Sequence, residues 1–291
     1  MASVSSDTEI DTMSIKDLRS LITLAGLSFA DCLEKPDFRV RAQEARARLS
    51  AGGGSAGGEA NKTAVLGGYE CSVHQTSEPA ELLVILLHGF GASNSDFASF
   101  PSMASSIPKR VAWVFPQAPA GGMGASAWWE LDAMKWFMAA QQGGAALGQL
   151  IREEPPGLSA ARTSLATLVS EAQKMFGDIP LERVVLAGFS QGAMTAMDLA
   201  LQLDGNVAGV TMISGAPIVV DQWAGKLKQH SGLKVFISHG QADQVLPFAA
   251  SGWCRDLLTQ GGADVQYHQH GGGHEVGSST TSPLLSFWSS L

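Results

Sequence analysis

Runs of apolar residues recur along the chain from about residue 64 and alternate with stretches of helical spacing. Six segments have the apolar content and length of buried strands: 82–87, 111–115, 183–187, 207–214, 233–238 and 265–268. Stretches with helical periodicity lie between and after them, at 161–176, 191–203, 249–258 and 283–291. This alternation predicts an α/β fold, with a mostly parallel central sheet covered by helices over residues 64–291.

A Gly- and Ser-rich run at residues 51–63 precedes this pattern and has the composition of a flexible linker. Residues 1–50 predict a small helical module of two short helices. The first begins at a capping pattern that starts with Ser14. The second has Pro36 in its first turn, and its apolar face is formed by Phe38, Ala42, Ala45 and Leu49.

The N-terminal pattern that starts at Met13-Ser-Ile-Lys-Asp-Leu-Arg19 and continues to Asp37 resembles SAP-like helix–extension–helix modules. Some relatives of such modules bind DNA and others bind proteins. Residues 1–50 hold 8 acids and 7 bases, a net charge of −1, and affinity for nucleic acid grows with the number of phosphates that cations neutralise. The low net charge therefore favours a protein-interaction or solubility role over nucleic acid. A helical pair without a transferable function is the alternative.

Composition narrows the class of protein further. Hydrophobic residues make up 45% and charged residues 16% of the 291 residues, enough apolar content for a large core. The net charge of −8 is opposite to that of a general nucleic-acid binder. Three separated cysteines indicate neither a disulfide framework nor a CxxC metal site. The N-terminus lacks a basic secretory region, and no early apolar run reaches the ~20 residues of a membrane span. We therefore expect a cytoplasmic protein.

The strongest chemical motif is Gly188-Phe-Ser-Gln-Gly192, which matches the G-x-S-x-G nucleophile elbow. The motif requires a strand before it and a helix after it, and the predicted strand 183–187 and helix 191–203 supply both. A second match, around Ser55, lies in the Gly-rich run with no strand before it. Ser190 is therefore the candidate nucleophile, and Ser55 is rejected.

A serine nucleophile needs a base and an orienting acid, which follow in this fold in the order Ser, Asp or Glu, His. Asp243 lies in the loop after the strand 233–238, at the edge where sites of α/β sheets open. Asp256 falls in a helical pattern and Asp264 precedes a strand, so Asp243 is preferred as the acid. His274, on a loop beyond three glycines, is the candidate general base.

Four other histidines are also candidates for a chemical role. His268, His270 and His274 have a spacing that could hold zinc through three imidazoles, which is the alternative for that segment. His88 and His239 are of a catalytic residue type but stand at the wrong places in the chain order. We expect both to hold their loops by hydrogen bonds.

Acyl transfer also needs two backbone N–H donors that meet the negative charge of the tetrahedral intermediate. In a nucleophile elbow one donor belongs to the residue after the serine, here Gln191. The other comes from the loop after an earlier strand, here Leu87-His-Gly-Phe-Gly91. Phe90 and Gln191 are therefore the predicted oxyanion hole.

Six motifs together resemble the phospholipase/carboxylesterase family of α/β-hydrolases, which includes the acyl-protein thioesterases. They occur in family order and are Leu87-His-Gly-Phe-Gly91, Phe115-Pro-Gln-Ala-Pro119, Trp128-Trp-Glu-Leu-Asp132, Gly188-Phe-Ser-Gln-Gly192, His239–Pro247 and Gly273-His-Glu-Val276. The resemblance implies an α/β-hydrolase fold and hydrolysis of small-molecule esters or acylated substrates through a seryl acyl-enzyme, without a metal or organic cofactor. It also makes Trp128 and Trp129 candidates for substrate binding.

The segment 133–160 is longer and less regular than in compact members of this family. Its aromatic and Met side chains, Trp136 to Met138, either border the substrate as a pocket or lid or pack an inserted helix into the core. Two other functions are alternatives to the hydrolase: a non-catalytic scaffold that uses the N-terminal module, and metal-dependent hydrolysis. The presence of Ser190, Asp243 and His274 together argues against a scaffold.

Overall fold

The computed structural model describes residues 10, 13, 18, 35–51, 62–121, 124–142 and 144–291. The chain divides into two compact units, residues 1–58 with 98–100 and residues 59–97 with 101–291. The larger unit contains the sheet and the residues to which chemistry was assigned above. In the described ranges no helix is long and apolar enough to cross a membrane.

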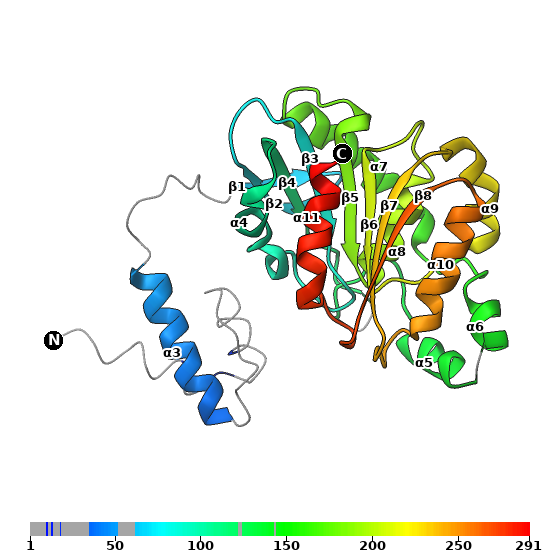
Figure 1. The fold of residues 1–291 in the computed structure, drawn as a ribbon, viewed down its shortest axis with the longest axis horizontal. Helices are drawn as coiled ribbons and strands as arrows, with labels where there is room; N and C mark the ends of the chain where they lie inside the picture. Colours follow the sequence, from blue (N-terminus) through cyan, green and yellow to red (C-terminus); the bar gives the residue numbers. More distant parts are fainter. Residues whose placement is uncertain are drawn as a thin grey trace. The chain divides into compact units, whose positions relative to one another are not determined.

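A mixed sheet forms the centre of the larger unit (Figure 1). Its strands are β1 (Lys62–Leu66), β2 (Tyr69–Gln75), β3 (Leu82–Leu87), β4 (Val111–Pro116), β5 (Val184–Phe189), β6 (Gly209–Ile213), β7 (Lys234–Gly240) and β8 (Asp264–His270). They lie in the order β1-β2-β4-β3-β5-β6-β7-β8. The pairs β1–β2 and β2–β4 are antiparallel, and the other neighbours are parallel. The predicted α/β-hydrolase fold is confirmed.

The six strands predicted from apolar runs are present as β3 to β8. The antiparallel pair β1–β2 was not predicted, because its residues are largely exposed or half-buried: in β1 only Leu66 is buried. β1 begins at Lys62, so the last two residues of the predicted linker 51–63 belong to the sheet, which is a correction. Residues 52–61 of that linker lie outside the described residues.

Helices cover both faces of the sheet. Val210 and Met212 of β6 lie in one core with Leu165 and Met197 from two of the helices. Thr211, between them, faces the opposite side, where its Oγ1 accepts a hydrogen bond at 2.9 Å from the indole of a C-terminal helix. The helices are α4 (Phe100–Met103), α5 (Ala133–Gln142), α6 (Gly144–Leu150), α7 (Leu158–Met175), α8 (Gln191–Ala200), α9 (Val220–Leu227), α10 (Phe248–Gln260) and α11 (Thr281–Ser289). Short 3-10 helices are Asn94–Phe97, Ala104–Ser106, Leu181–Arg183, Lys228–His230 and Ser278–Thr280.

The smaller unit contains α3 (Lys35–Ala51), where the sequence predicts the second helix of the N-terminal module. Phe38, Ala42 and Ala45 of its predicted apolar face are buried with Ile10 and Leu18. The side chain of Leu49 and most of the predicted first helix lie outside the described residues. The resemblance to SAP-like modules and the division into a module 1–50, a linker and a catalytic domain 64–291 stay predictions. The bounds 51–63 of the linker are corrected, because Ala51 lies in α3 and Lys62 in β1.

The register of the parallel strands brings four loops to one edge of the sheet. Leu87 at the end of β3 pairs with Gly188 on β5, and Gly240 at the end of β7 pairs with His270 on β8. The loops that follow these strands therefore emerge side by side at the carboxyl edge, where sites of α/β proteins are built. These loops carry the candidate residues.

Candidate active site

Ser190 lies at a sharp turn between β5 and α8. Its φ of 55° and ψ of −120° are a rare backbone conformation for a residue with a side chain. Its N–H donates to the carbonyl of Ile213 on β6 at 2.8 Å. Gly188 and Gly192 allow the turn, because a Cβ on either residue would lie about 2 Å from backbone atoms, 2.2 Å from Gly192 and 2.1 Å from Leu87 O respectively. This is the strained strand–turn–helix that the G-x-S-x-G motif predicts.

Ser190, His274 and Asp243 form one hydrogen-bonded chain. The Oγ of Ser190 lies 2.9 Å from Nε2 of His274, and Nδ1 of His274 lies 2.8 Å from Oδ2 of Asp243. An ionised Asp243 only accepts, so Nδ1 carries the proton and Nε2 is free to accept from the Ser190 hydroxyl. The side chain of Asp243 is fully buried, and that of His274 is 16% exposed.

Asp243 is held ionised by several donors. Its Oδ1 accepts the N–H groups of Val245 and Leu246, each at 2.8 Å, and its Oδ2 faces Nε2 of His239 at 3.2 Å as well as His274. Burial alone would raise the pKa of Asp243, but the hydrogen bonds from His239, His274 and the Leu246 N–H outweigh it and hold this pKa below its usual range. The carboxylate therefore keeps its charge and its orientation toward His274.

Close backbone packing brings the loops of Asp243 and His274 together. The Ala242 N–H donates to the carbonyl of Gly272 at 3.0 Å, and a Cβ on Gly240 would lie 2.2 Å from the carbonyl of Gly273. Only a residue without a side chain at position 240 allows this approach. Gly240 at the end of β7 therefore lets the loop before His274 pack directly against the backbone of the Asp243 loop.

The predicted oxyanion donors, Phe90 and Gln191, flank Ser190. Gln191 begins α8, so its N–H has no partner within the helix. Among the described residues, neither the Gln191 N–H nor the Phe90 N–H donates to another protein group. The loop that carries Phe90 lies against the elbow, since a Cβ on Gly89 would be 3.3 Å from Cβ of Ser190. Neither N–H group is engaged by a described residue, and their role as oxyanion donors stays a prediction.

The side chain of Gln191 ties the elbow to the two tryptophans, a contact that the sequence did not reveal. Its Nε2 donates to the carbonyl of Trp129 at 2.8 Å, and its Oε1 accepts from the Trp128 N–H at 3.2 Å. The indoles are both 3% exposed and donate to the carbonyl of His88 and to Oγ1 of Thr195. This burial favours a positioning role for Trp128. Contact of the Trp128 and Trp129 rings with substrate stays a prediction.

The remaining histidines hold loops. His88 is buried, donates from Nδ1 to the Gly89 carbonyl at 2.8 Å and accepts at Nε2 from the Ala118 N–H at 3.0 Å. Burial lowers its pKa, and it stays neutral. His239 donates from Nε2 to the carbonyl of Leu246 at 3.0 Å. The hydrogen bonds expected for His88 and His239 are both present.

The zinc alternative finds no geometric support. His268 bonds Ser279 Oγ at 3.2 Å, His270 accepts the Gly272 N–H at Nδ1, and His274 faces Ser190. In the part of the chain that the structure describes, no three His, Cys, Asp or Glu side chains are grouped as a metal site. The three imidazoles have separate surroundings.

The inserted segment forms the helices α5 and α6, which pack beside α9 and α10. Leu147, Leu150 and Ile151 are buried in one cluster with Val220. Met134 and Met138 are 68% and 47% exposed, whereas Trp136 is half-buried. The segment thus forms a helical pair, and Trp136 is an aromatic side chain that it turns inward.

Comparisons with known proteins support the same family of folds. The family model described as Phospholipase/Carboxylesterase matches residues 69–289. Acyl-protein thioesterase 1 of Debaryomyces hansenii is 29% identical over 207 residues, which are 69% of this chain and 86% of that protein. The homologue in Yarrowia lipolytica is 26% identical over 219 residues, 70% and 89% of the two chains.

Solved structures agree in fold. Esterase PE8 aligns with a TM-score of 0.59 and 26% identity, over 72% of this chain and 91% of that chain. A carboxylesterase from Mesorhizobium loti also has a TM-score of 0.59, at 17% identity, over 78% and 98% of the two chains. At that identity the second likeness concerns the fold alone.

Proposed function

Since the chain belongs to the phospholipase/carboxylesterase family and is a hydrolase of esters or thioesters, we propose that Ser190, His274 and Asp243 are its catalytic triad. The observation that carries the proposal is the hydrogen-bonded chain from Ser190 Oγ through His274 to Asp243, at 2.9 and 2.8 Å. The alternative of a non-catalytic scaffold has no support from the comparisons.

The geometry gives each residue a role in acylation. His274 Nε2 takes the proton of the Ser190 hydroxyl as Oγ attacks the substrate carbonyl carbon. The N–H groups of Phe90 and Gln191 stabilise the resulting oxyanion. The tetrahedral intermediate collapses when His274 returns the proton to the departing alcohol or thiol, which leaves the acyl group on Ser190. Asp243 stabilises the transient imidazolium and keeps Nδ1 protonated.

Deacylation repeats these steps with water as the nucleophile. His274 accepts a proton from water, the hydroxide oxygen attacks the acyl-enzyme, and Ser190 leaves with the proton that His274 returns. The products are a carboxylic acid and the free enzyme. Every group that takes part in these steps belongs to the chain, the substrate or water. A cytoplasmic location and a protein partner for residues 1–50 stay predictions of the sequence.

The test is hydrolysis of p-nitrophenyl esters from acetate to palmitate by the wild type and by Ser190→Ala. We expect kcat to fall at least about 10⁴-fold in Ser190→Ala for every ester that the wild type hydrolyses. Ser55→Ala is the matched control, because Ser55 has the same local motif without a preceding strand, and it should keep full activity. Turnover that survives in Ser190→Ala would contradict the assignment, and the best ester would define the acyl length.

A further inference from the structure

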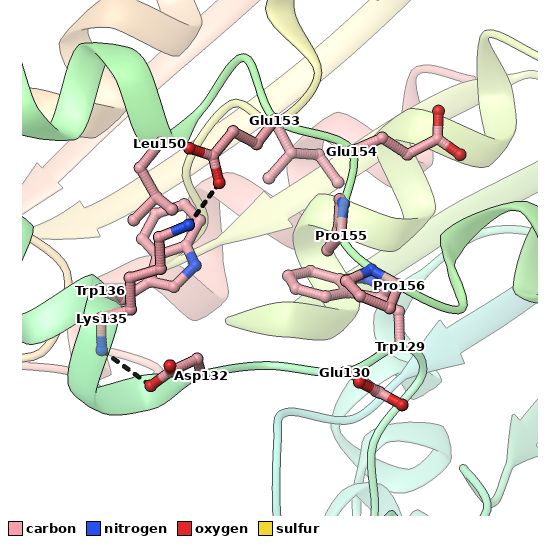
Figure 2. A pocket seen from close by; sticks show the side chains of 11 residues that line it. Trp129, Glu130, Asp132, Lys135, Trp136, Leu150, Glu153, Glu154, Pro155 and Pro156 are labelled. Atoms are coloured by element: carbon pink, nitrogen blue, oxygen red, sulfur yellow. Dashed lines mark hydrogen bonds and ion pairs between the residues drawn. The ribbon is translucent and has the colours of Figure 1, made fainter.

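A cavity of about 120 Å³ opens between α5 and the loop that follows α6 (Figure 2). One water takes up ~30 Å³ of the liquid, so the cavity can hold a small organic group. Its apolar walls include the indoles of Trp129 and Trp136 together with Leu150 and Ile218. Two tryptophans in one small cavity are a feature that recognises cations as well as apolar groups, because the face of an indole is electron-rich.

The polar part of the lining is acidic. It contains the side chains of Glu130, Asp132, Glu153 and Glu154 and only one base, Lys135. Lys135 forms an ion pair with Glu153, which cancels both charges (Figure 2).

The other carboxylates differ in how far they are neutralised. Glu154 accepts from Gln222 Nε2 at 2.7 Å and lies 3.8 Å from Arg162. Glu130 and Asp132 form no ion pair with any described residue. Asp132 accepts the Lys135 N–H at the start of α5 at 2.8 Å, so the N-terminus of that helix partly offsets its charge (Figure 2). Glu130 is the carboxylate without such a contact among the described residues, and the local potential is negative.

The cavity adjoins the catalytic elbow. The backbone of Trp129 is hydrogen-bonded to the side chain of Gln191, the residue after the nucleophile. Ile218, on another wall, follows β6 in the chain, and the last residue of β6 accepts the Ser190 N–H. A group seated between the tryptophans can therefore belong to the same molecule whose carbonyl lies at Ser190.

We propose that this cavity binds a quaternary ammonium group of the substrate, and this inference rests on the proposed function of Ser190. The half-buried indole of Trp136 supplies cation–π attraction, the buried Trp129 closes the apolar wall, and Glu130 supplies the negative potential. A neutral group of the same shape gains the apolar contacts but neither of these contributions. The cavity thus distinguishes a charged from an uncharged substrate of equal size.

The experiment compares choline with 3,3-dimethylbutan-1-ol, which has the same shape with carbon in place of the charged nitrogen. Calorimetric titration of the wild-type protein measures both affinities without any need for turnover. We expect choline to bind about tenfold more tightly, the order of magnitude of one desolvated cation–π contact. Choline should also inhibit hydrolysis of p-nitrophenyl acetate competitively.

Three variants test the assignment. Trp136→Leu should remove the preference for choline, and Glu130→Gln should reduce it severalfold. Glu182→Gln removes the same charge from an exposed residue before β5 and should leave the preference unchanged. Because Trp136 is half-buried, thermal unfolding checks its variant, and Glu130→Gln keeps the test valid if that variant does not fold.

The outcomes separate the two proposals. Equal affinities, or tighter binding of the neutral alcohol, overturn the cation subsite and indicate an apolar pocket, even if Ser190-dependent hydrolysis is found. A preference for choline that persists in both cavity variants also overturns it. A cavity-dependent preference without Ser190-dependent hydrolysis supports the cation site and contradicts the proposed function.

Discussion

The elbow and the inserted segment are held by opposite kinds of contact. In the elbow, residues 184–200, every residue of α8 is buried. Gly188 lies against backbone atoms of α8, and Gly192 lies against backbone atoms at the end of β3 and in the loop that follows it. In the inserted segment, residues 133–160, exposed Met side chains and surface ion pairs surround a small apolar cluster. The reacting groups thus stand where backbone sterics fix their positions. The wall of the cavity lined by Trp136 belongs instead to the inserted segment, where we expect substitutions to have smaller effects on stability.

The largest expected effect is on catalysis, at the acid of the triad. Asp243→Asn keeps the shape of the side chain but cannot hold the His274 proton on Nδ1 by charge, so the wrong tautomer becomes favoured. We expect kcat for p-nitrophenyl esters to fall about 10³–10⁴-fold, while circular dichroism shows an unchanged fold. A loss below tenfold would show that Asp243 is only a turn residue.

The effect of the same variant on the free energy of unfolding should depend on pH. The pKa of Asp243 is lower in the folded protein than the usual value of ~3.9 in an unfolded chain. The folded state therefore binds fewer protons, and the stabilisation from the charge is full above about pH 4 and is lost as the pH falls through the folded pKa. The difference in free energy of unfolding between wild type and Asp243→Asn should be constant from pH 7 to about 4 and shrink below that. A difference that disappears already at pH 6 would contradict the lowered pKa.

The next prediction concerns steric clashes. It compares the substitution of one glycine in the elbow with that of one glycine in the inserted segment. Gly192→Ala would place a Cβ 2.1 Å from Leu87 O and 2.6 Å from His88 O, and neither backbone atom can move without displacing β3 or the Phe90 loop. We expect the free energy of unfolding to fall by about 3 kcal/mol, with loss of ester hydrolysis. Urea denaturation measures the first quantity.

The matched control is Gly148→Ala in α6. No atom lies within 4 Å of a Cβ there, and alanine favours a helix interior. We expect this change to stabilise the protein by about 0.5–1 kcal/mol and to leave activity intact. If Gly192→Ala and Gly148→Ala changed the free energy of unfolding by similar amounts, the contrast between the two regions would be wrong.

A buried ion pair beneath the elbow gives the third effect. Arg162 on α7 donates to both oxygens of Asp198 on α8, at 2.7 and 2.8 Å, and the Asp198 side chain is 1% exposed. Arg162→Ala leaves a buried carboxylate with only the Trp223 indole as a side-chain donor. We expect a loss of about 3 kcal/mol in urea denaturation. Restoration of most of it in the double variant with Asp198→Asn would identify the unpaired charge as the cause.

The contrast between the regions also explains what the sequence could predict of the fold. β3 to β7 are buried on both faces, so continuous apolar runs marked them. β8 is an edge strand in which only His270 is buried, and it was found from the short run 265–268. β1 and β2 lie at the antiparallel end, where half-exposed positions break the apolar pattern. α5 and α6 were described only as an irregular insertion, because Gly143, Gly144 and Gly148 interrupt the helical pattern of the sequence. Their place beside α9 and α10 depends on tertiary packing.

In the candidate site, chain order and loop position selected Ser190, Asp243 and His274 from the sequence. Other contacts depend on side-chain conformation and on loops that meet in space. The clamp of Gln191 on the Trp129 carbonyl joins residues 62 positions apart. The approach of His239 to Asp243 follows from the turn after β7. Neither contact has a local pattern that sequence analysis could detect.

The smallest expected effect is at the surface of the inserted segment, where Arg152 forms an ion pair with Asp221. Both side chains are more than half exposed, at 58% and 69%, so water and salt screen the attraction, and ordering two flexible side chains opposes it. We expect Arg152→Ala to change the free energy of unfolding by less than about 0.5 kcal/mol, and 0.5 M NaCl to remove even that difference. Leu150→Ala, in the apolar cluster of the same segment, should cost about 2–3 kcal/mol. If the arginine variant instead lost as much as the leucine variant, ion pairs would anchor the segment, and raised salt alone would be enough to alter the cavity beside Trp136.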